Sequence, residues 1–196
     1  VANGGSPAFE DEQKILAQYT GWGGLSDAFD PNKSAWSNEY SQLKAALSES
    51  EYEAARSSTL TAFYTPATVI HPIYRALERF GVKGGKILEP SMGTGAFLAH
   101  GHFGSSDAKF YGVELDRITG RISKQLYQKA NIQVTGYENA LLPDNYFDCV
   151  IGNVPFGNFQ VNDPQYNRLH FPIHAATSSV RCACPTMRSR AVELKS

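Results

Sequence analysis

The chain of 196 residues is long enough for one hydrophobic core and a small additional unit. With 42% hydrophobic and 19% charged residues, its composition is that of an ordinary soluble globular protein. The formal net charge of −1 lacks the basic excess of a free-standing nucleic-acid-binding protein. No apolar run reaches the length of a membrane span, and no secretory signal pattern opens the chain, so we expect a cytoplasmic protein.

Residues 1–60 are expected to form an N-terminal helical extension. A first helix is predicted to begin at Ser6-Pro7, with Phe9, Ile15 and Leu16 available for burial. Glycines around the first tryptophan then interrupt the helical pattern, and a second helix is predicted from about Ser37 to Leu47.

Two further helix starts follow. Ser48 and Glu51 have the spacing of a capping box. Thr65 is a suitable N-cap and Pro66 a suitable first helical residue, and Gly81 ends the helix that they begin. The apolar residues of that helix recur at helical spacing at Val69, Ile70, Ile73, Leu77 and Phe80.

From Lys86 onward, predicted strands alternate with predicted helices, which favours an α/β fold with a parallel sheet. In the helix after the second strand, Ile118, Ile122 and Leu126 share a face. Ligands of such sheets bind at the carboxyl ends of the strands. The expected strands are residues 86–90, 109–115, 131–138 and 146–153.

The segment LEPSMGTGAF, residues 88–97, follows the first predicted strand with a carboxylate and two glycines that open a helix. Glycines there let the backbone approach a ligand closely, although a plain strand-to-helix turn has the same pattern. A dinucleotide loop is disfavoured because Leu98 occupies the third glycine position, and a triphosphate loop lacks its lysine. Glu114 ends the next strand, where a carboxylate accepts hydrogen bonds from ribose hydroxyls, so an adenosine-type cofactor is favoured.

The ordered motifs FYTP, LEPSMGTGAF, YGVELD and NVPF resemble those of S-adenosylmethionine-dependent adenine-N6 DNA methyltransferases. Together with YTGWGGLSDAFD and IGNVPFG, they are similar to the methylase region of very large methylase–helicase proteins of bacterial conjugative elements and phages. The resemblance covers roughly residues 10–175. It implies a Rossmann-like class I methyltransferase sheet in residues 61–175, apparently truncated after its fourth strand, with an irregular or disordered tail in residues 176–196.

The resemblance also implies partners. DNA would be contacted mostly through regions outside this chain, within a larger multidomain protein. No metal is expected, because the three cysteines and five histidines show no zinc-site spacing.

The same resemblance assigns cofactor contacts. The methionine and sugar portions of S-adenosylmethionine would meet the FYTP motif and the glycine loop, and Glu114 would hold the ribose hydroxyls. Either Glu138 or Asn139 would lie near the cofactor adenine. The implied cofactor-binding residues are Thr65, Pro66, Glu89, Ser91, Gly93, Gly95, Phe97, Glu114, Glu138 and Asn139.

Asn153, Val154, Pro155 and Phe156 would form the catalytic loop. The Asn153 side-chain oxygen and the Val154 carbonyl would each accept one N–H of the adenine amine, and fixed acceptors stabilise the positive charge that grows on the attacking nitrogen. Phe156 would stack on a flipped base. Valine stands where the family commonly has a first proline, but it keeps the required carbonyl, and Pro155 still restricts its backbone.

Alternatives stay open from the sequence. The loop is also a common turn sequence. Related loops serve enzymes that methylate amines of RNA or of protein glutamine. The chain also ends soon after the loop, so an incomplete and catalytically inactive cofactor-binding fragment is a third interpretation.

Overall fold

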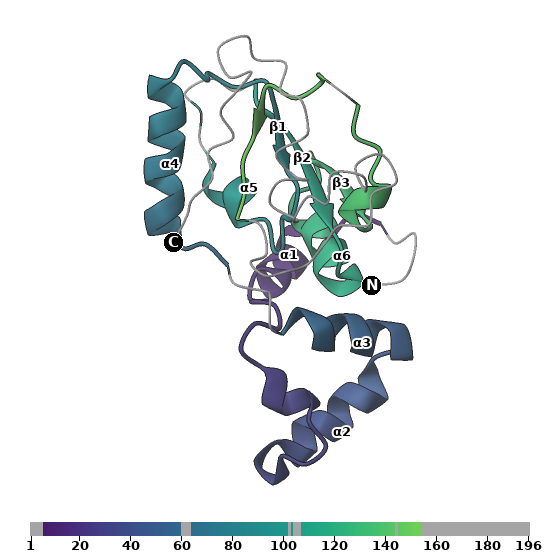
Figure 1. The fold of residues 1–196 in the computed structure, drawn as a ribbon. Coiled ribbons are helices and arrows are strands. Elements are labelled where there is room, and N and C mark those ends of the chain that lie inside the picture. Colours follow the sequence, from purple (N-terminus) through teal and green to yellow (C-terminus); the bar gives the residue numbers. More distant parts are fainter. Residues whose placement is uncertain (1–5, 60–63, 102, 104–106, 144, 154–196) are drawn as a thin grey trace, which may run out of the picture.

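The computed structural model describes residues 6–59, 64–101, 103, 107–143 and 145–153. At its centre is a four-stranded parallel sheet in the order β3-β2-β1-β4 (Figure 1), which confirms the predicted α/β class. The expected end of the sheet after its fourth strand lies outside the described residues. The strands are β1 (Lys86–Glu89), β2 (Lys109–Glu114), β3 (Asn131–Val134) and β4 (Cys149–Val150).

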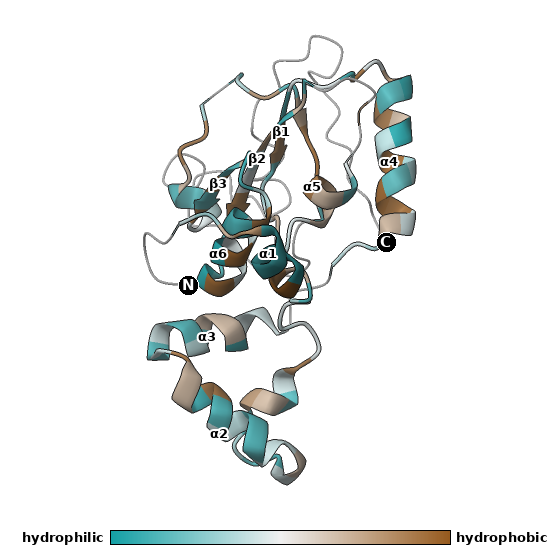
Figure 2. Cartoon of the chain, turned by 180° about the vertical axis from the view of Figure 1, so that it is seen from behind, coloured by the Kyte–Doolittle hydropathy of each residue, from teal (hydrophilic) through white to brown (hydrophobic). Residues whose placement is uncertain are grey.

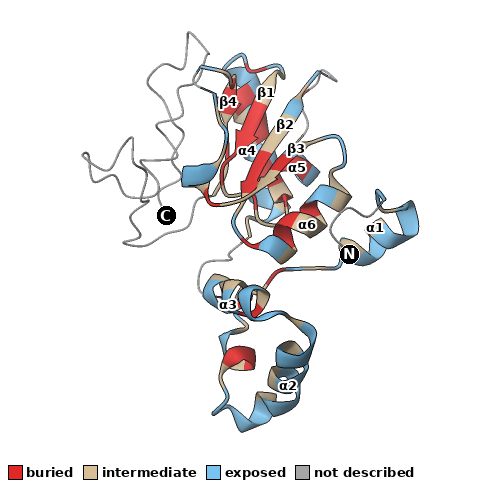
Figure 3. Ribbon diagram, turned by 90° about the vertical axis from the view of Figure 1, so that its right-hand side faces the viewer, coloured by how far each residue is buried: buried red, intermediate tan, exposed pale blue. Residues whose placement is uncertain are grey.

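Helices α4 (Ala67–Arg79) and α5 (Ala96–His100) cover one face of the sheet. Ile70, Tyr74 and Leu77 recur every three or four residues in α4, so they form one buried stripe. This stripe packs with Ile87 of β1 in a core whose buried residues gather at the middle of the molecule (Figure 3).

Helix α6 (Arg117–Leu126) packs on β2 and β3 of the same sheet. Gly120 allows a close approach, because a Cβ there would lie 2.8 Å from Val134 Cγ2. Asp116 caps the helix by accepting hydrogen bonds from the backbone N–H groups of Ile118 and Thr119.

Aromatic side chains lie on the other face of the sheet. Leu88 follows Ile87 in β1 and therefore points to this opposite face, where it is also fully buried. Tyr111 of β2 packs edge to face against Tyr146 and Phe147, and the Tyr111 and Tyr146 hydroxyls lie 3.0 Å apart. Residues from the segment before β4 thus close this face.

The N-terminal region folds around a hydrophobic cluster of its own, below the sheet in Figure 1. Figure 2 shows hydrophilic residues on the outer sides of its helices. Its buried members Ala28, Phe29, Tyr52 and Ala55, with Trp22, Trp36, Tyr40, Leu43 and Leu47 packed on them, are called the N-terminal cluster below. The helical elements are α1 (Glu10–Leu16), η1 (Ser26–Phe29), η2 (Ser34–Trp36), α2 (Ser37–Ala46) and α3 (Glu49–Ser58).

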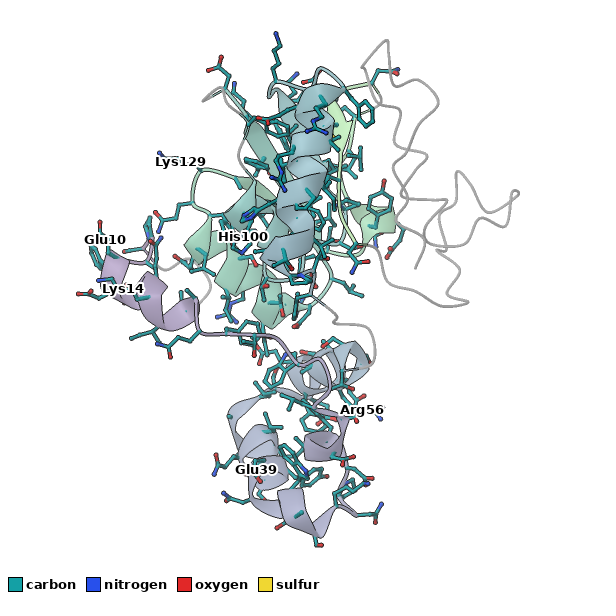
Figure 4. The ribbon with its side chains drawn as sticks, turned by 90° about the vertical axis from the view of Figure 1, so that its left-hand side faces the viewer. Glu10, Lys14, Glu39, Arg56, His100 and Lys129 are labelled. Carbon is teal, nitrogen blue, oxygen red and sulfur yellow. The ribbon has the colours of Figure 1, made fainter. Side chains whose placement is uncertain are left out.

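Polar contacts join this region to α6. The Ala8 N–H donates to Gln125 Oε1 at 2.7 Å, and Gln13 Nε2 donates to the Gln125 carbonyl at 2.8 Å. Glu51 of α3 pairs with Arg121 of α6 at 3.3 Å. Other charged side chains, such as the labelled Glu10, Lys14, Glu39 and Arg56, lie at the periphery (Figure 4). The boundaries expected at residues 60 and 175 stay predictions, since both positions lie outside the described residues.

Several local predictions can be checked. The second helix and the Ser48–Glu51 capping box are confirmed. The first helix begins only at Glu10, and burial of Phe9 and Ile15 was wrong, because α1 contacts α6 through polar Gln13.

The start of α4 differs from the prediction by one residue. Pro66 has an extended backbone and is itself the N-cap, so Thr65 does not cap α4 and the first helical residue is Ala67. Exposed Val69 and Phe80 lie off the buried stripe of this helix. None of the helices in the described ranges is long and apolar enough to span a membrane.

Candidate cofactor site

The glycine loop, residues 90–95, connects the carboxyl end of β1 to α5. Gly93 and Gly95 have φ values of +54° and +78°, in the left-handed region that side chains rarely adopt. A Cβ at Gly93 would lie 2.5 Å from Tyr64 Cε1, and one at Gly95 would overlap the Tyr127 ring. Both positions therefore require glycine for backbone conformation and for space.

Hydrogen bonds hold this loop on both sides. The Gly93 N–H donates to Glu114 Oε2 at 2.7 Å, which ties the loop to the end of β2. From the side of α6, Ser123 Oγ donates to the Gly93 carbonyl at 2.9 Å and the Tyr127 hydroxyl to the Thr94 carbonyl at 3.0 Å. The loop is thus preorganised by β2 and α6.

Glu89, the last residue of β1, is buried, with only 3% of its surface exposed. Its Oε2 has no hydrogen-bond partner among the residues that the structure describes. Burial raises its pKa well above the usual range, and the nearby Glu114 carboxylate raises it further. The group is therefore suited to a cationic partner, such as the ammonium of a bound amino acid moiety.

Glu114 is the second carboxylate at this edge. Its Oε1 accepts the Asp116 N–H at 2.8 Å, and its Oε2 accepts the Gly93 N–H. Burial raises its pKa, whereas these backbone hydrogen bonds oppose the rise. Because a carboxylate has about four acceptor sites, this group keeps capacity to accept a hydrogen bond from a ligand hydroxyl.

Four other residues predicted to contact the cofactor differ in their burial and in their distance from the glycine loop. Thr65 follows Tyr64, which lies against Gly93, and Thr65 Oγ1 is buried with no partner in the described part of the chain. Pro66 is exposed and Ser91 half-buried. Phe97 packs in the core below α4, so its side chain lies in the protein interior.

Glu138 and Asn139 lie in η3 (Tyr137–Asn139), after β3. The Thr135 N–H donates to the Glu114 carbonyl at 2.9 Å, which brings the start of this connection to the end of β2. Both side chains are exposed, and Asn139 Nδ2 donates to Glu138 Oε1 at 2.9 Å. The choice between them for the adenine contact stays open.

Asn153 follows β4 and is half-buried. The Ile151 N–H donates to the Leu88 carbonyl at 2.9 Å, and a Cβ at Gly152 would lie 3.5 Å from Glu89 Cγ. The backbone leading to Asn153 therefore passes beside Glu89. Val154, Pro155 and Phe156 lie outside the described residues.

Sequence reasoning missed four residues at this site. Tyr64 and Tyr127 contact the loop glycines, and Ser123 fixes the loop backbone. Leu115, directly after Glu114, is 73% exposed and offers an apolar surface beside the carboxylate. An apolar residue after a strand-end acid was a signal in the sequence, whereas the two tyrosine contacts depend on the fold.

The ends of three strands thus meet at the carboxyl edge of the sheet: β1 with Glu89 and the loop of Gly93 and Gly95, β2 with Glu114, and β4 followed by Asn153. The unsatisfied Oε2 of Glu89, the Glu114 carboxylate and the close-approach glycines fit a ligand with a cationic end and hydroxyl groups. Among the described residues, no group of three or more histidine, cysteine or acidic side chains could hold a metal ion.

Two viral proteins are similar in sequence. The Defense against restriction protein B of Escherichia phage P1 is 28% identical over 155 residues, which are 78% of this chain and 5% of that protein. The Modification methylase CviBIII of Paramecium bursaria Chlorella virus NC1A is 33% identical over 95 residues, covering 48% of this chain and 25% of that protein. The chain therefore spans a quarter or less of these relatives.

Solved structures show weak overall similarity. The plantazolicin methyltransferase BpumL in complex with SAH is 18% identical, with a TM-score of 0.40, over 82% of this chain and 55% of that chain. A protein-L-isoaspartate O-methyltransferase is 14% identical, with a TM-score of 0.39, over 67% and 50% of the two chains.

A family model described as N-6 DNA Methylase matches residues 49–178, which are 130 of the 196 residues. The match includes the glycine loop, both strand-end carboxylates and Asn153. It supports S-adenosylmethionine as the cofactor and methyl transfer as the reaction. By this match the chain belongs to the N-6 DNA methylase family.

Proposed function

We propose that this chain is the cofactor-binding and catalytic region of a DNA methyltransferase that methylates the N6 amine of adenine. The observation that carries the proposal is the convergence of Glu89, the Gly93–Gly95 loop, Glu114 and Asn153 at one sheet edge. S-adenosylmethionine supplies the electrophilic methyl group when bound.

Glu89 and Glu114 would bind different portions of the cofactor. The buried Glu89 carboxyl receives the ammonium group of the methionine portion, which compensates a charge that is costly to bury alone. Glu114 accepts hydrogen bonds from ribose hydroxyls while it continues to fix the Gly93 N–H. Leu115 covers an adjacent apolar portion of the adenosine.

The catalytic loop acts on the base. The Asn153 side-chain oxygen and the Val154 carbonyl accept the two N–H groups of the adenine amine, so positive charge on the attacking nitrogen is stabilised. Phe156 stacks on a base that has left the duplex. Positioning and electrostatic stabilisation together account for the rate, with no metal ion in this proposal.

Adenine in DNA is favoured over RNA or protein glutamine by the family description and by a relative named a modification methylase. Because the chain spans a small part of its relatives, further parts of a larger protein are proposed to grip DNA and to select the target sequence. The phage relative favours an origin in a mobile element.

The test compares methyl transfer from labelled S-adenosylmethionine to duplex DNA, RNA and protein by the full-length protein that contains this chain. Label is expected on N6 of adenine in DNA, and Asn153→Ala is expected to lower the rate about 100-fold or more. Equal labelling of DNA by Asn153→Ala would contradict the assigned chemistry, and labelling only of RNA or protein would favour the alternative substrates.

A further inference from the structure

Residues 19–24, between α1 and η1, lie outside the motifs that the proposed function uses. The Trp22 ring packs edge to face against Tyr19 on one side and Phe29 on the other, with centroids 5.9 and 5.7 Å apart. The segment therefore contacts the N-terminal cluster through Trp22 and contacts α6 through Tyr19.

A first route runs from Tyr19 toward the glycine loop by hydrogen bonds. The Tyr19 hydroxyl lies 2.9 Å from Thr119 Oγ1, and the Thr119 hydroxyl donates to Asp116 Oδ2 at 2.5 Å. Because the Thr119 hydroxyl has one hydrogen, which the carboxylate takes, Tyr19 is the donor to Thr119.

The same route continues through the backbone. The Asp116 N–H donates to one oxygen of Glu114, and the other Glu114 oxygen accepts the Gly93 N–H. A continuous series of hydrogen-bonded groups thus leads from Tyr19 to the cofactor loop.

A second route is made by packing of Tyr64. At Gly21, where φ is +77°, an added Cβ would overlap the Tyr64 hydroxyl, and at Gly93 it would meet the Tyr64 ring. The ring is therefore wedged between the backbones of residues 19–24 and of the cofactor loop. Burial, with the carboxylates of Glu114 and Asp116, raises the pKa of Tyr64 to about 12, so the phenol stays neutral beside them.

We propose that residues 19–24 set the position of Gly93 and Glu114, and that Tyr19 and Tyr64 are positioning residues for the cofactor site. The inference rests on the proposed function, because Gly93 and Glu114 are its cofactor contacts. It couples the position of residues 19–24, whose Trp22 packs on Phe29, to cofactor binding. A force or partner that displaces residues 19–24 weakens cofactor binding, and by reciprocity bound cofactor holds the segment in place.

The experiment compares Tyr19→Phe with the control Tyr146→Phe. Each variant loses one hydroxyl contact of a tyrosine, but the contact of Tyr146 is with Tyr111, on the face of the sheet away from α4 and α5. Titration with S-adenosylmethionine is expected to show about 2- to 10-fold weaker binding for Tyr19→Phe, as one hydrogen bond predicts, and no change for Tyr146→Phe. The NMR signal of the Gly93 amide, in protein without ligand, is expected to shift in Tyr19→Phe alone.

Thr119 supplies a rescue test and a double-mutant cycle. Thr119→Ser keeps the hydroxyl and is expected to bind like the wild type, whereas Thr119→Val is expected to bind at least as weakly as Tyr19→Phe, because it also removes the hydrogen bond to Asp116. The double variant Tyr19→Phe/Thr119→Val is expected to be no weaker than Thr119→Val, since Tyr19 acts on the loop through the Thr119 hydroxyl.

Wild-type affinity in Tyr19→Phe, with the Gly93 amide signal unmoved, would overturn the positioning proposal. If the wild-type chain itself bound no S-adenosylmethionine, the proposed function would fail instead. The Gly93 signal would then still decide the positioning proposal, by moving in Tyr19→Phe or staying in place.

Discussion

The cofactor edge of the sheet and the N-terminal cluster differ in the kind of side chain that they bury. At the edge, acids are buried with open acceptor sites, and the backbone at Gly93 and Gly95 adopts conformations that exclude side chains. In the N-terminal cluster, aromatic rings such as Phe29 and Tyr52 pack together and the Tyr52 hydroxyl donates to a carbonyl. The first region keeps polar groups available for a ligand, and the second uses burial for stability. Substitutions should therefore separate ligand binding from stability.

The largest effect is expected for Gly95→Ala. Gly95 has a φ of +78°, which a residue with a Cβ rarely adopts, and the added Cβ overlaps the Tyr127 ring, so the loop must move. Titration should show that S-adenosylmethionine affinity falls roughly 100-fold, because small misplacements of a positioning group have effects of this size.

Gly81→Ala is the matched control for that substitution. Gly81 also has a positive φ, +90°, but nothing lies within 4 Å of an added Cβ. It should lose about 1 kcal/mol of unfolding free energy from backbone strain, with affinity unchanged. Equal affinities for the Gly81→Ala and Gly95→Ala proteins would show that space beside the loop does not matter.

An intermediate effect is expected for Glu89→Gln, which should raise the free energy of unfolding at neutral pH and lower the affinity for the cofactor. The raised pKa means that wild-type stability from this group is complete below the ordinary value of 4.5 and declines as pH rises toward the higher folded value. The glutamine variant should therefore gain unfolding free energy over the wild type as pH increases from 5 to 8, measured by urea denaturation without ligand.

Cofactor affinity should move in the opposite direction, falling about 10-fold because glutamine offers no charge to an ammonium group. A variant that loses stability at pH 8 would mean that the Glu89 carboxylate is compensated in the ligand-free protein.

The smallest effect on binding is expected for Leu43→Ala in the N-terminal cluster. Truncation of this partly buried side chain should lower the unfolding free energy by about 2 kcal/mol, the low end for leucine. Affinity for S-adenosylmethionine should stay within about twofold of wild type, because residues 19–24 keep their own contacts. A tenfold loss of affinity would remove the distinction between the two regions.

The parallel sheet and the strand-end acids were accessible from sequence, because both follow from local patterns, whereas the strand order came from the structure. Glu89 and Glu114 each end an apolar run, and alternating elements predict parallel strands whose carboxyl ends share an edge. The family resemblance added Asn153.

The buried face of helix α6 could not be predicted from the hydropathy pattern of its sequence. Its predicted apolar face, Ile118, Ile122 and Leu126, is only half-buried, whereas Thr119, Gly120 and Ser123 are buried. Small and hydroxyl-bearing residues face inward because the helix lies close to β3 and to the loop carbonyls. Hydropathy treats such residues as exposed, and their partners are distant in sequence.

The contacts of Tyr64 and Tyr127 with the glycines were inaccessible for a related reason. Each joins residues about thirty positions apart through a shape that exists only after folding. The Pro66 cap was missed because Thr65 and Pro66 both suit a helix start, and only the extended backbone of Pro66 decides between them.

The most direct test of the central claim is calorimetric titration of the folded chain and of Glu114→Ala with S-adenosylmethionine. The wild type should bind at one site, and Glu114→Ala should bind about 10- to 100-fold more weakly, since it loses hydrogen bonds to a charged acceptor and releases the Gly93 N–H. A folded wild-type chain that binds no S-adenosylmethionine, or a Glu114→Ala variant that binds as tightly as the wild type, would contradict the cofactor site described at this edge.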